Sequence, residues 1–155
     1  MSRRAAGCLF SNGKLALSGY HPKNKFIDGI GGKCLEGESA HRTAIRETME
    51  ELFEFKKYPA FLVDEVMKLL PARKCVRTGF YTNFMYSFHD LELMMMHLKC
   101  RLMESPLYDE FPETLEDLLL KRNIYHRSEI THLLLLPALP LIRIHPLFLK
   151  DLSST

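Results

Sequence analysis

The sequence lacks any apolar stretch long enough to cross a membrane. Its longest one, residues 133–142, is interrupted by Pro137 and Pro140, whereas a transmembrane helix needs about 20 consecutive apolar residues. The N-terminal residues include arginines, but the apolar segment that follows them is too short for a signal peptide. We therefore expect no membrane partner and a cytoplasmic or otherwise intracellular protein.

Cysteine is also scarce, and no two cysteines are spaced like a redox or metal-binding pair. There is no Cys-x-x-Cys, and no zinc-like spacing links the four cysteines with the seven histidines. We expect Cys8, Cys34, Cys75 and Cys100 to be reduced and mostly to serve packing. Cys34 is the exception, because it lies within the functional segment that the sequence indicates and is a place where an oxidant could act.

Neither sign of charge dominates the composition. The formal net charge is +2, which by itself is too small to indicate binding to nucleic acid. The chain has 155 residues, of which 46% are hydrophobic and 26% charged. These values are ordinary for a globular protein with a real core. We expect one domain over residues 1–155.

The most informative segment is residues 31–51, in which a glycine pair precedes a helix rich in carboxylates. Ser39 can accept a hydrogen bond from the first free amide groups of a helix, so we expect the helix to begin there. Glu47, Glu50 and Glu51 then follow at intervals of three and four, which places them along one face. The opposite, mostly apolar face is expected to pack on a core. It consists of Ala44, Ile45, Thr48, Met49 and Leu52.

Carboxylates at this spacing repel one another by a few tenths of a kcal/mol per pair on an isolated helix. Arg46 can neutralise part of the charge, but divalent cations do so better, and oxygen ligands favour Mg²⁺ or Mn²⁺ over zinc. Mg²⁺ shares its coordination positions with water and substrate phosphates, which suggests phosphoryl chemistry. The alternative is that the acidic face is simply solvated, the usual fate of a charge run.

The register of these residues resembles the signature of the Nudix hydrolases, which cleave nucleoside diphosphates linked to another group. The matching positions are Gly32, Glu38 after five residues, then Arg46, Glu47, Glu50 and Glu51 after seven more. The resemblance implies an α/β/α sandwich with a mixed sheet. It also implies that Glu38 and Arg46 form a salt bridge that orients the carboxylates.

By the same resemblance, Glu47, Glu50 and Glu51 bind the metal ions, and the carbonyl of Gly31 often joins them. The metal ions polarise a phosphate and lower the pKa of a bound water, and a carboxylate takes the proton as the water attacks phosphorus. One P–O bond of a pyrophosphate is broken. Glu47 and Glu51 are both candidates for the base, and the sequence does not separate base from ligand.

Two further residues are candidates for this site. In Nudix enzymes an acid from a later loop often completes the site. Glu129 fits that place because it directly precedes residues 130–136, an apolar run that predicts a buried strand. Lys33, beside the expected glycine turn, could contact a substrate phosphate. An exposed loop glutamate and a solvent-facing lysine are the ordinary alternatives.

The end of the acidic helix departs from the family pattern. The family usually has a glycine after the last acidic pair, where a left-handed residue ends the helix, but this chain has Phe53 and Glu54. We therefore expect the helix to continue toward Lys56 and Lys57 and to stop before Pro59.

The remaining pattern mixes strands and helices. An Asn-Gly turn at residues 11–14 favours a tight hairpin, and two apolar helical stripes predict a helical insertion over residues 89–127. The other expected elements are a helix over 61–70, a strand or hairpin over 75–88, insertion helices over 90–103 and 112–122, and a short closing helix or turn at 146–149.

The expected substrate is a nucleotide or a nucleotide-linked small molecule. Extra helices on a Nudix core also resemble the mRNA-decapping branch, for which basic side chains of the insertion could form a rim for capped RNA. They are Lys99, Arg101, Lys121, Arg122 and Arg127. A Nudix-fold module that binds a nucleotide or RNA without cleaving it, and an interaction protein that docks through its methionine-rich helix, are the alternatives.

Overall fold

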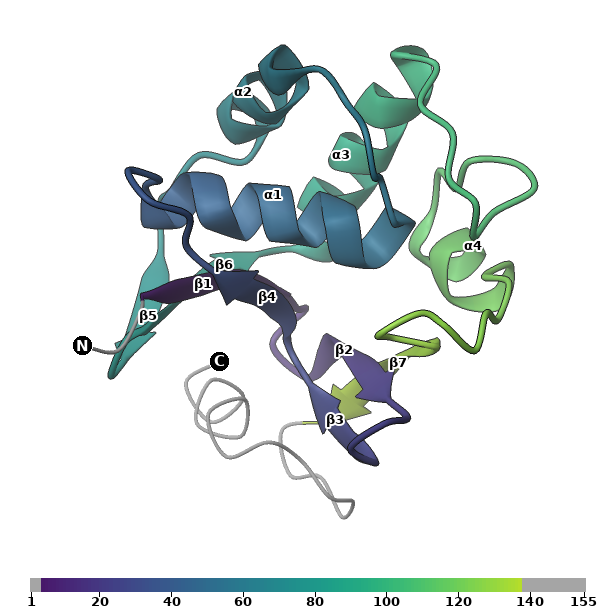
Figure 1. Ribbon diagram of the computed structural model, residues 1–155, viewed down its shortest axis with the longest axis horizontal. Helices are drawn as coiled ribbons and strands as arrows, with labels where there is room; N and C mark the ends of the chain where they lie inside the picture. The colour runs from purple at the N-terminus through teal and green to yellow at the C-terminus, as the bar shows by residue number, and fades with distance from the viewer. Residues whose placement is uncertain (1–3, 138–155) are drawn as a thin grey trace.

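Two β-sheets form the framework of the structure, a computed structural model that describes residues 4–137 (Figure 1). In the first sheet, of order β4-β1-β6-β5, β1 runs parallel to β6 and the other pairs are antiparallel. In the second sheet, of order β3-β2-β7, both pairs are antiparallel. The strands are β1 (Ala5–Phe10), β2 (Leu15–His21), β3 (Phe26–Asp28), β4 (Ile30–Lys33), β5 (Cys75–Thr78), β6 (Tyr81–Tyr86) and β7 (His132–Pro137).

Helices pack over the first sheet. Helix α1 lies directly on β1 and β4, and α2 and α3 lie beyond it (Figure 1). The helices are α1 (Ala40–Phe53), α2 (Ala60–Leu69), α3 (Phe88–Cys100) and α4 (Leu115–Leu120). The predicted combination of a mixed sheet with packed helices is therefore confirmed, and α3 and α4 fall between β6 and β7, where the helical insertion was expected. The expected closing segment at 146–149 lies outside the described residues.

The apolar face of α1 forms the centre of the core, as its periodicity predicts. Ala44, Ile45, Met49 and Leu52 have no exposed surface. Thr48 is also buried. Its hydroxyl donates to the carbonyl of Ala44 at 2.7 Å, and this hydrogen bond satisfies the polar atom inside the core. This face fixes the rotation of α1, so the acidic face must turn away from the sheet interior.

The predicted tight turn forms at Asn12 and Gly13, where the amide of Asn12 donates to the carbonyl of Leu15 at 3.2 Å, but the predicted pairing of the first two strands is wrong. β1 pairs with β4 and β6, whereas β2 pairs with β3 and β7, and among the described residues only the isolated bridge between Ser11 and Ala16 joins the two strands. The physical reason is burial: β1 is apolar on both faces and becomes an interior strand of the mixed sheet. The chain therefore changes sheets at the Asn-Gly turn.

The acidic helix ends earlier than predicted. Its last residue is Phe53, and Glu54 takes the left-handed conformation, with φ of 54°, that a glycine would supply. The amide of Glu54 donates to the carbonyl of Glu50 at 2.8 Å, which closes the last turn. Phe53 and Phe55 are both buried, with ring centroids 5.4 Å apart, and this packing holds Glu54 between them in a conformation that costs a non-glycine residue energy.

Two of the cysteines are not packing residues. Cys8 and Cys34 are buried, but Cys75 and Cys100 are exposed, and all four are free thiols. Among the methionines of α3, Met94 and Met95 are fully buried in the core, whereas Met96 is exposed. No helix of the described residues is long and apolar enough to cross a membrane.

Candidate active site

Helix α1 presents its carboxylates at the edge of the first sheet, next to β4. Ser39 caps the helix, with its hydroxyl accepting from the amide of Arg42 at 3.1 Å, as predicted. The amide of Gly31 donates to Oε1 of Glu51 at 3.0 Å. The sequence-predicted glycine pair and acidic helix are therefore in direct contact.

The glycine pair lies in a strand and not in the predicted turn. Gly31 stands opposite Gly7 in the β1–β4 ladder. A Cβ on Gly31 would lie 2.1 Å from the hydroxyl of Tyr81, and a Cβ on Gly32 would lie 2.4 Å from the carboxyl carbon of Glu47. Both glycines are required because neighbouring groups occupy the space of a side chain: sheet backbone and an aromatic ring at the first, a carboxylate at the second.

The predicted pair of Glu38 and Arg46 forms a two-pronged salt bridge behind the acidic face. Nε of Arg46 donates to Oε2 of Glu38 at 2.8 Å and Nη2 donates to Oε1 at 3.0 Å. Glu38 also accepts from the hydroxyl of Thr43 at 2.6 Å and from the amide of Leu35 at 3.1 Å. These bonds, that of Arg46 first, lower the pKa of Glu38 to about 2. Nη2 of Arg46 further donates to the carbonyl of Lys33, which ties β4 to the helix.

Arg46 reaches the acidic face as well. Its Nη1 donates to Glu47 at 2.9 Å and to Glu50 at 3.2 Å. Glu50 accepts a further hydrogen bond from the hydroxyl of Tyr58 at 2.9 Å. One guanidinium thus orients two of the three carboxylates, while the third, Glu51, is held by the backbone of β4.

The carboxylates nearest β4 carry more negative charge than their surroundings neutralise. Burial raises the pKa of Glu51 well above its ordinary value, and the charges of Glu129, Glu47 and Asp28 add to the effect. The pKa of Glu47 is also raised, by burial first and then by Glu50 and Glu129 against the opposing effect of Arg46. Groups that repel one another in a partly desolvated site are ready to accept a cation.

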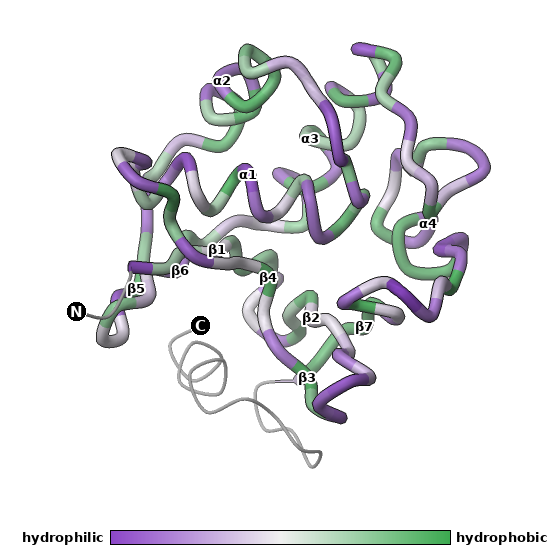
Figure 2. The backbone as a smooth tube through the Cα atoms, viewed as in Figure 1, coloured by the Kyte–Doolittle hydropathy of each residue, from purple (hydrophilic) through white to green (hydrophobic). Residues whose placement is uncertain are grey.

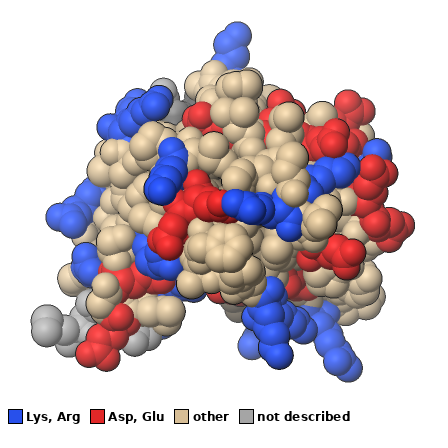
Figure 3. Space-filling view, turned by 90° about the horizontal axis from the view of Figure 1, so that it is seen from above, with Lys and Arg blue, Asp and Glu red and all other residues tan. Residues whose placement is uncertain are grey.

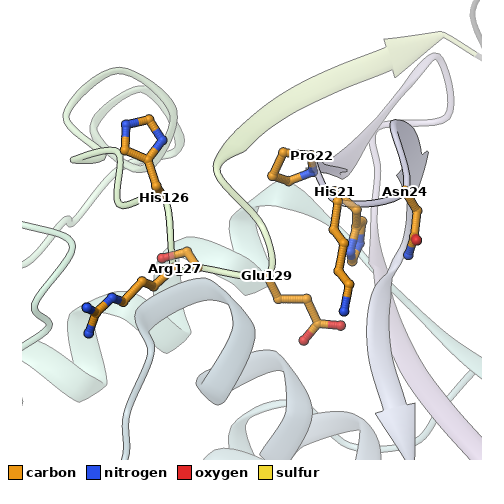
Figure 4. A pocket seen from close by; sticks show the side chains of 8 residues that line it. His21, Pro22, Asn24, His126, Arg127 and Glu129 are labelled. Carbon is orange, nitrogen blue, oxygen red and sulfur yellow. The ribbon is translucent and has the colours of Figure 1, made fainter.

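Glu129 approaches this cluster from the far end of the chain. It is exposed, precedes β7, and its carboxylate extends into a pocket that His21 also lines (Figure 4). Its charge acts on both Glu47 and Glu51. Lys33 has an exposed side chain at the end of β4, so its proposed contact with a phosphate stays a prediction.

The donor set fits a hard divalent cation by its chemistry. Glu47, Glu51 and Glu129 supply only oxygen, and their mutual repulsion is the charge imbalance that Mg²⁺ or Mn²⁺ would offset. Within residues 4–137, however, no three carboxylate, imidazole or thiol side chains converge on one point closely enough to form a ready-made metal site.

Sequence reasoning missed the role of Arg122 in holding this site together. Its guanidinium donates to the carbonyls of Leu52 at 2.6 Å and Glu51 at 3.2 Å, in the last turn of α1, and to that of Ile130 at 3.2 Å. A cation at this end of a helix satisfies free carbonyls and complements the helix dipole. Arg122 thus links α1 to the residue that follows Glu129. No spacing in the sequence indicates this role.

The basic rim expected for RNA is not formed. Arg101 is paired with Glu65, Lys99 with Glu110 and Glu113, and Lys121 with Asp117. In the view from above, Lys and Arg side chains lie at several separate places, including a group at the lower edge, while many Asp and Glu side chains lie toward the right (Figure 3). Of the five basic residues in that prediction, Arg127 is the one that lines a pocket beside the acidic cluster.

Comparison with known proteins adds little to this geometry. No protein-family description matches the sequence, and no curated protein is similar to it. Among solved structures, a NUDIX-family hydrolase from Clostridium perfringens is similar with 12% identity and a TM-score of 0.44, over 99% of this chain and 95% of that one. A bifunctional NMN adenylyltransferase/ADP ribose pyrophosphatase from Francisella tularensis has the same identity and TM-score over 98% of this chain and 36% of that one. Similarity at this level carries no argument about function.

Proposed function

We propose that this protein is a Nudix-type hydrolase that uses Mg²⁺ or Mn²⁺ to cleave a pyrophosphate bond in a nucleotide or nucleotide-linked substrate. One observation carries the proposal. The Glu38–Arg46 salt bridge and strand β4 hold the α1 carboxylates in a partly desolvated site, where the charge of Glu129 adds to theirs and is not balanced. Such a cluster is costly for folding, and its use is to bind cations that carry a substrate phosphate.

Each residue has a defined part in this reaction. Glu47, Glu50, Glu51 and Glu129 would hold the cations, with the carbonyl of Gly31 as a further oxygen ligand. The cations, when bound, lower the pKa of water and neutralise charge on the phosphates. The pKa values of Glu47 and Glu51 are raised, chiefly by burial, which makes each a stronger base, in its ionised form, toward the attacking water.

The test is a hydrolysis screen with and without Mg²⁺ or Mn²⁺, covering nucleoside triphosphates, ADP-ribose, dinucleoside polyphosphates and capped RNA. We expect cation-dependent turnover of one substrate class that Glu51→Gln lowers by about 100-fold or more. Glu116→Gln is the matched control. Glu116 is exposed on α4, so this substitution removes the same charge at a position away from the site. Equal rates for wild type and Glu51→Gln would refute the mechanism.

A second candidate is a Nudix-fold module that binds a nucleotide or RNA without cleaving it. It is favoured by one observation, that no three ligating side chains converge at one point within the described residues. The same screen separates the two functions. Tight binding of a nucleotide by wild type and Glu51→Gln alike, with no product from either, would support the binding module.

A further inference from the structure

A pocket of about 760 Å³ opens beside Glu129, between two segments far apart in the sequence. One wall is the turn between β2 and β3, and the other is the segment that leads into β7 (Figure 4). Both segments are predominantly hydrophilic (Figure 2). The lining residues are His21, Pro22, Lys23, Asn24, His126, Arg127, Ser128 and Glu129.

Two buried polar atoms in the lining have no protein partner in the described structure. They are Nε2 of His21, a residue that is 9% exposed, and the hydroxyl of Ser128, a residue that is 6% exposed. The ring of His21 is held in place by stacking on Phe26 at 5.4 Å. An unsatisfied buried polar group costs free energy, and both of these atoms belong to residues that line the pocket, so a ligand toward which His21 and Ser128 shift would satisfy both.

The charge of the pocket indicates the sign of that ligand. Lys23 and Arg127 are exposed in the lining, and neither forms an ion pair within residues 4–137, unlike the paired cations of α3 and α4. Glu129 is the acidic residue of the lining, and it also faces the carboxylates of α1, where a bound cation would neutralise it. Two cations without an ion pair among the described residues, in one lining with two buried hydrogen-bonding groups, suit an anion with several oxygens.

We propose that this pocket binds phosphate groups of the nucleotide substrate, with Arg127 and Lys23 neutralising charge and His21 and Ser128 donating hydrogen bonds. The proposal deepens the proposed function and rests on it. Glu129 is the shared wall, so a phosphate in the pocket and a cation at α1 would lie on either side of the same carboxylate.

The pocket has room for more than one phosphate. Its volume lies in the range of sites for whole small-molecule ligands. Past Arg127 and Ser128 it adjoins a second pocket of about 330 Å³, which Lys56 and Tyr125 also line. A polyphosphate chain can therefore bind with the remainder of the substrate extending along the same surface.

The test is calorimetric titration of the full-length protein with inorganic triphosphate, with and without Mg²⁺. We expect wild type to bind, Arg127→Gln to weaken binding by about 10-fold or more, and Ser128→Ala to weaken it by several-fold. Lys68→Gln is the charge-matched control on α2, an exposed lysine outside the pocket, and should bind like wild type. The His21 ring protons should shift in the NMR spectrum when triphosphate binds.

A stability measurement excludes a simple loss of folding. Ser128→Ala removes a buried hydroxyl without a partner, so its urea midpoint should equal or exceed that of wild type. Ser105→Ala, at a buried serine whose hydroxyl donates to the carbonyl of Phe53 at 2.6 Å, should lower the midpoint. Equal triphosphate affinity of wild type, Arg127→Gln and Ser128→Ala would overturn the proposal, as would binding of an RNA oligonucleotide but not of triphosphate.

Failure of this subsite and failure of the proposed function give different results. Cation-dependent hydrolysis with an unchanged KM in Arg127→Gln and Ser128→Ala would support the proposed hydrolase function and refute the phosphate subsite. Triphosphate binding that depends on both residues, without cleavage of any nucleotide, would support the subsite and refute the hydrolase function.

Discussion

Gly31 and Gly32 are adjacent glycines, yet a side chain at each position would meet a different kind of obstacle. A Cβ on Gly31 would lie 2.6 Å from the carbonyl oxygen of Ala6 and 2.7 Å from Cα of Gly7, and neither backbone atom can move without opening the sheet. A Cβ on Gly32 would meet the carboxylate of Glu47, the far end of a flexible side chain. The first glycine serves the fold, and the second serves the site.

We therefore expect substitution by alanine to affect stability at Gly31 and the site at Gly32. Gly31→Ala should lower the free energy of unfolding by about 1 to 3 kcal/mol, the usual cost of an overpacked interior. Gly32→Ala should leave stability nearly unchanged but displace Glu47, and so weaken Mg²⁺ binding and lower turnover. Urea unfolding and Mg²⁺ titration of both variants check this. Comparable loss of stability in the two variants would contradict the assignment.

At the scale of elements, the salt bridge of Glu38 with Arg46 joins the loop before α1 to the helix and, through Lys33, to β4. It is the most enclosed ion pair of α1: the side chains of Arg46 and Glu38 are 13% and 7% exposed, against 33% and 58% for the pair of Arg42 and Asp64. Each pair has its arginine on α1, so a comparison of the two separates the effect of burial from that of charge.

Glu38→Gln should lower the free energy of unfolding by about 2 to 3 kcal/mol, because it leaves a buried guanidinium with one partner fewer. Asp64→Asn should cost less than about 1 kcal/mol. The folded-state pKa of Glu38 is lowered to about 2 from its usual 4.5, so its contribution is complete above about pH 4.5 and is lost as the pH falls toward 2. The gap between wild type and Glu38→Gln in urea unfolding should therefore close below pH 3; a gap that stays constant to pH 2 would be the contrary result.

For the whole molecule, the acidic cluster makes stability depend on cations and pH. The pKa of Glu51 is raised in the folded state, mainly by burial, so its ionisation opposes folding. In the absence of a cation, Glu51 therefore stabilises the folded state at low pH relative to high pH. This contribution is lost as the pH rises through the raised pKa. A bound divalent cation reverses the effect, because it favours the ionised carboxylate.

We expect Mg²⁺ or Mn²⁺ to raise the unfolding temperature of wild type, with a larger increase at pH 8 than at pH 5. Glu51→Gln should raise the unfolding temperature in EDTA at pH 8, because it removes a buried charge that destabilises the folded state. It should also abolish most of the response to the cation. Circular dichroism melts in EDTA and in excess cation measure both. KCl at equal ionic strength is the control, and an equal increase with KCl would indicate general screening only.

The sequence by itself determined the acidic helix and its partners. Helical periodicity fixes which side of residues 40–53 enters the core, and a fixed spacing from Gly32 through Glu38 to Glu51 could be recognised because helix geometry is local. The helix N-cap at Ser39 follows that expectation, and the salt bridge of Glu38 with Arg46 follows the family resemblance.

Only the tertiary structure decided how distant segments meet. Strand pairing is non-local, so nothing in the local pattern places β1 and β2 in different sheets or the glycine pair in a strand. The same holds for Arg122, which binds carbonyls of α1 across 70 residues of sequence. The pocket of His21 and Ser128 exists because the β2–β7 pairing brings residues 21 and 128 to the same end of one sheet. Residues that act through such long-range contacts cannot be identified from a spacing in the sequence.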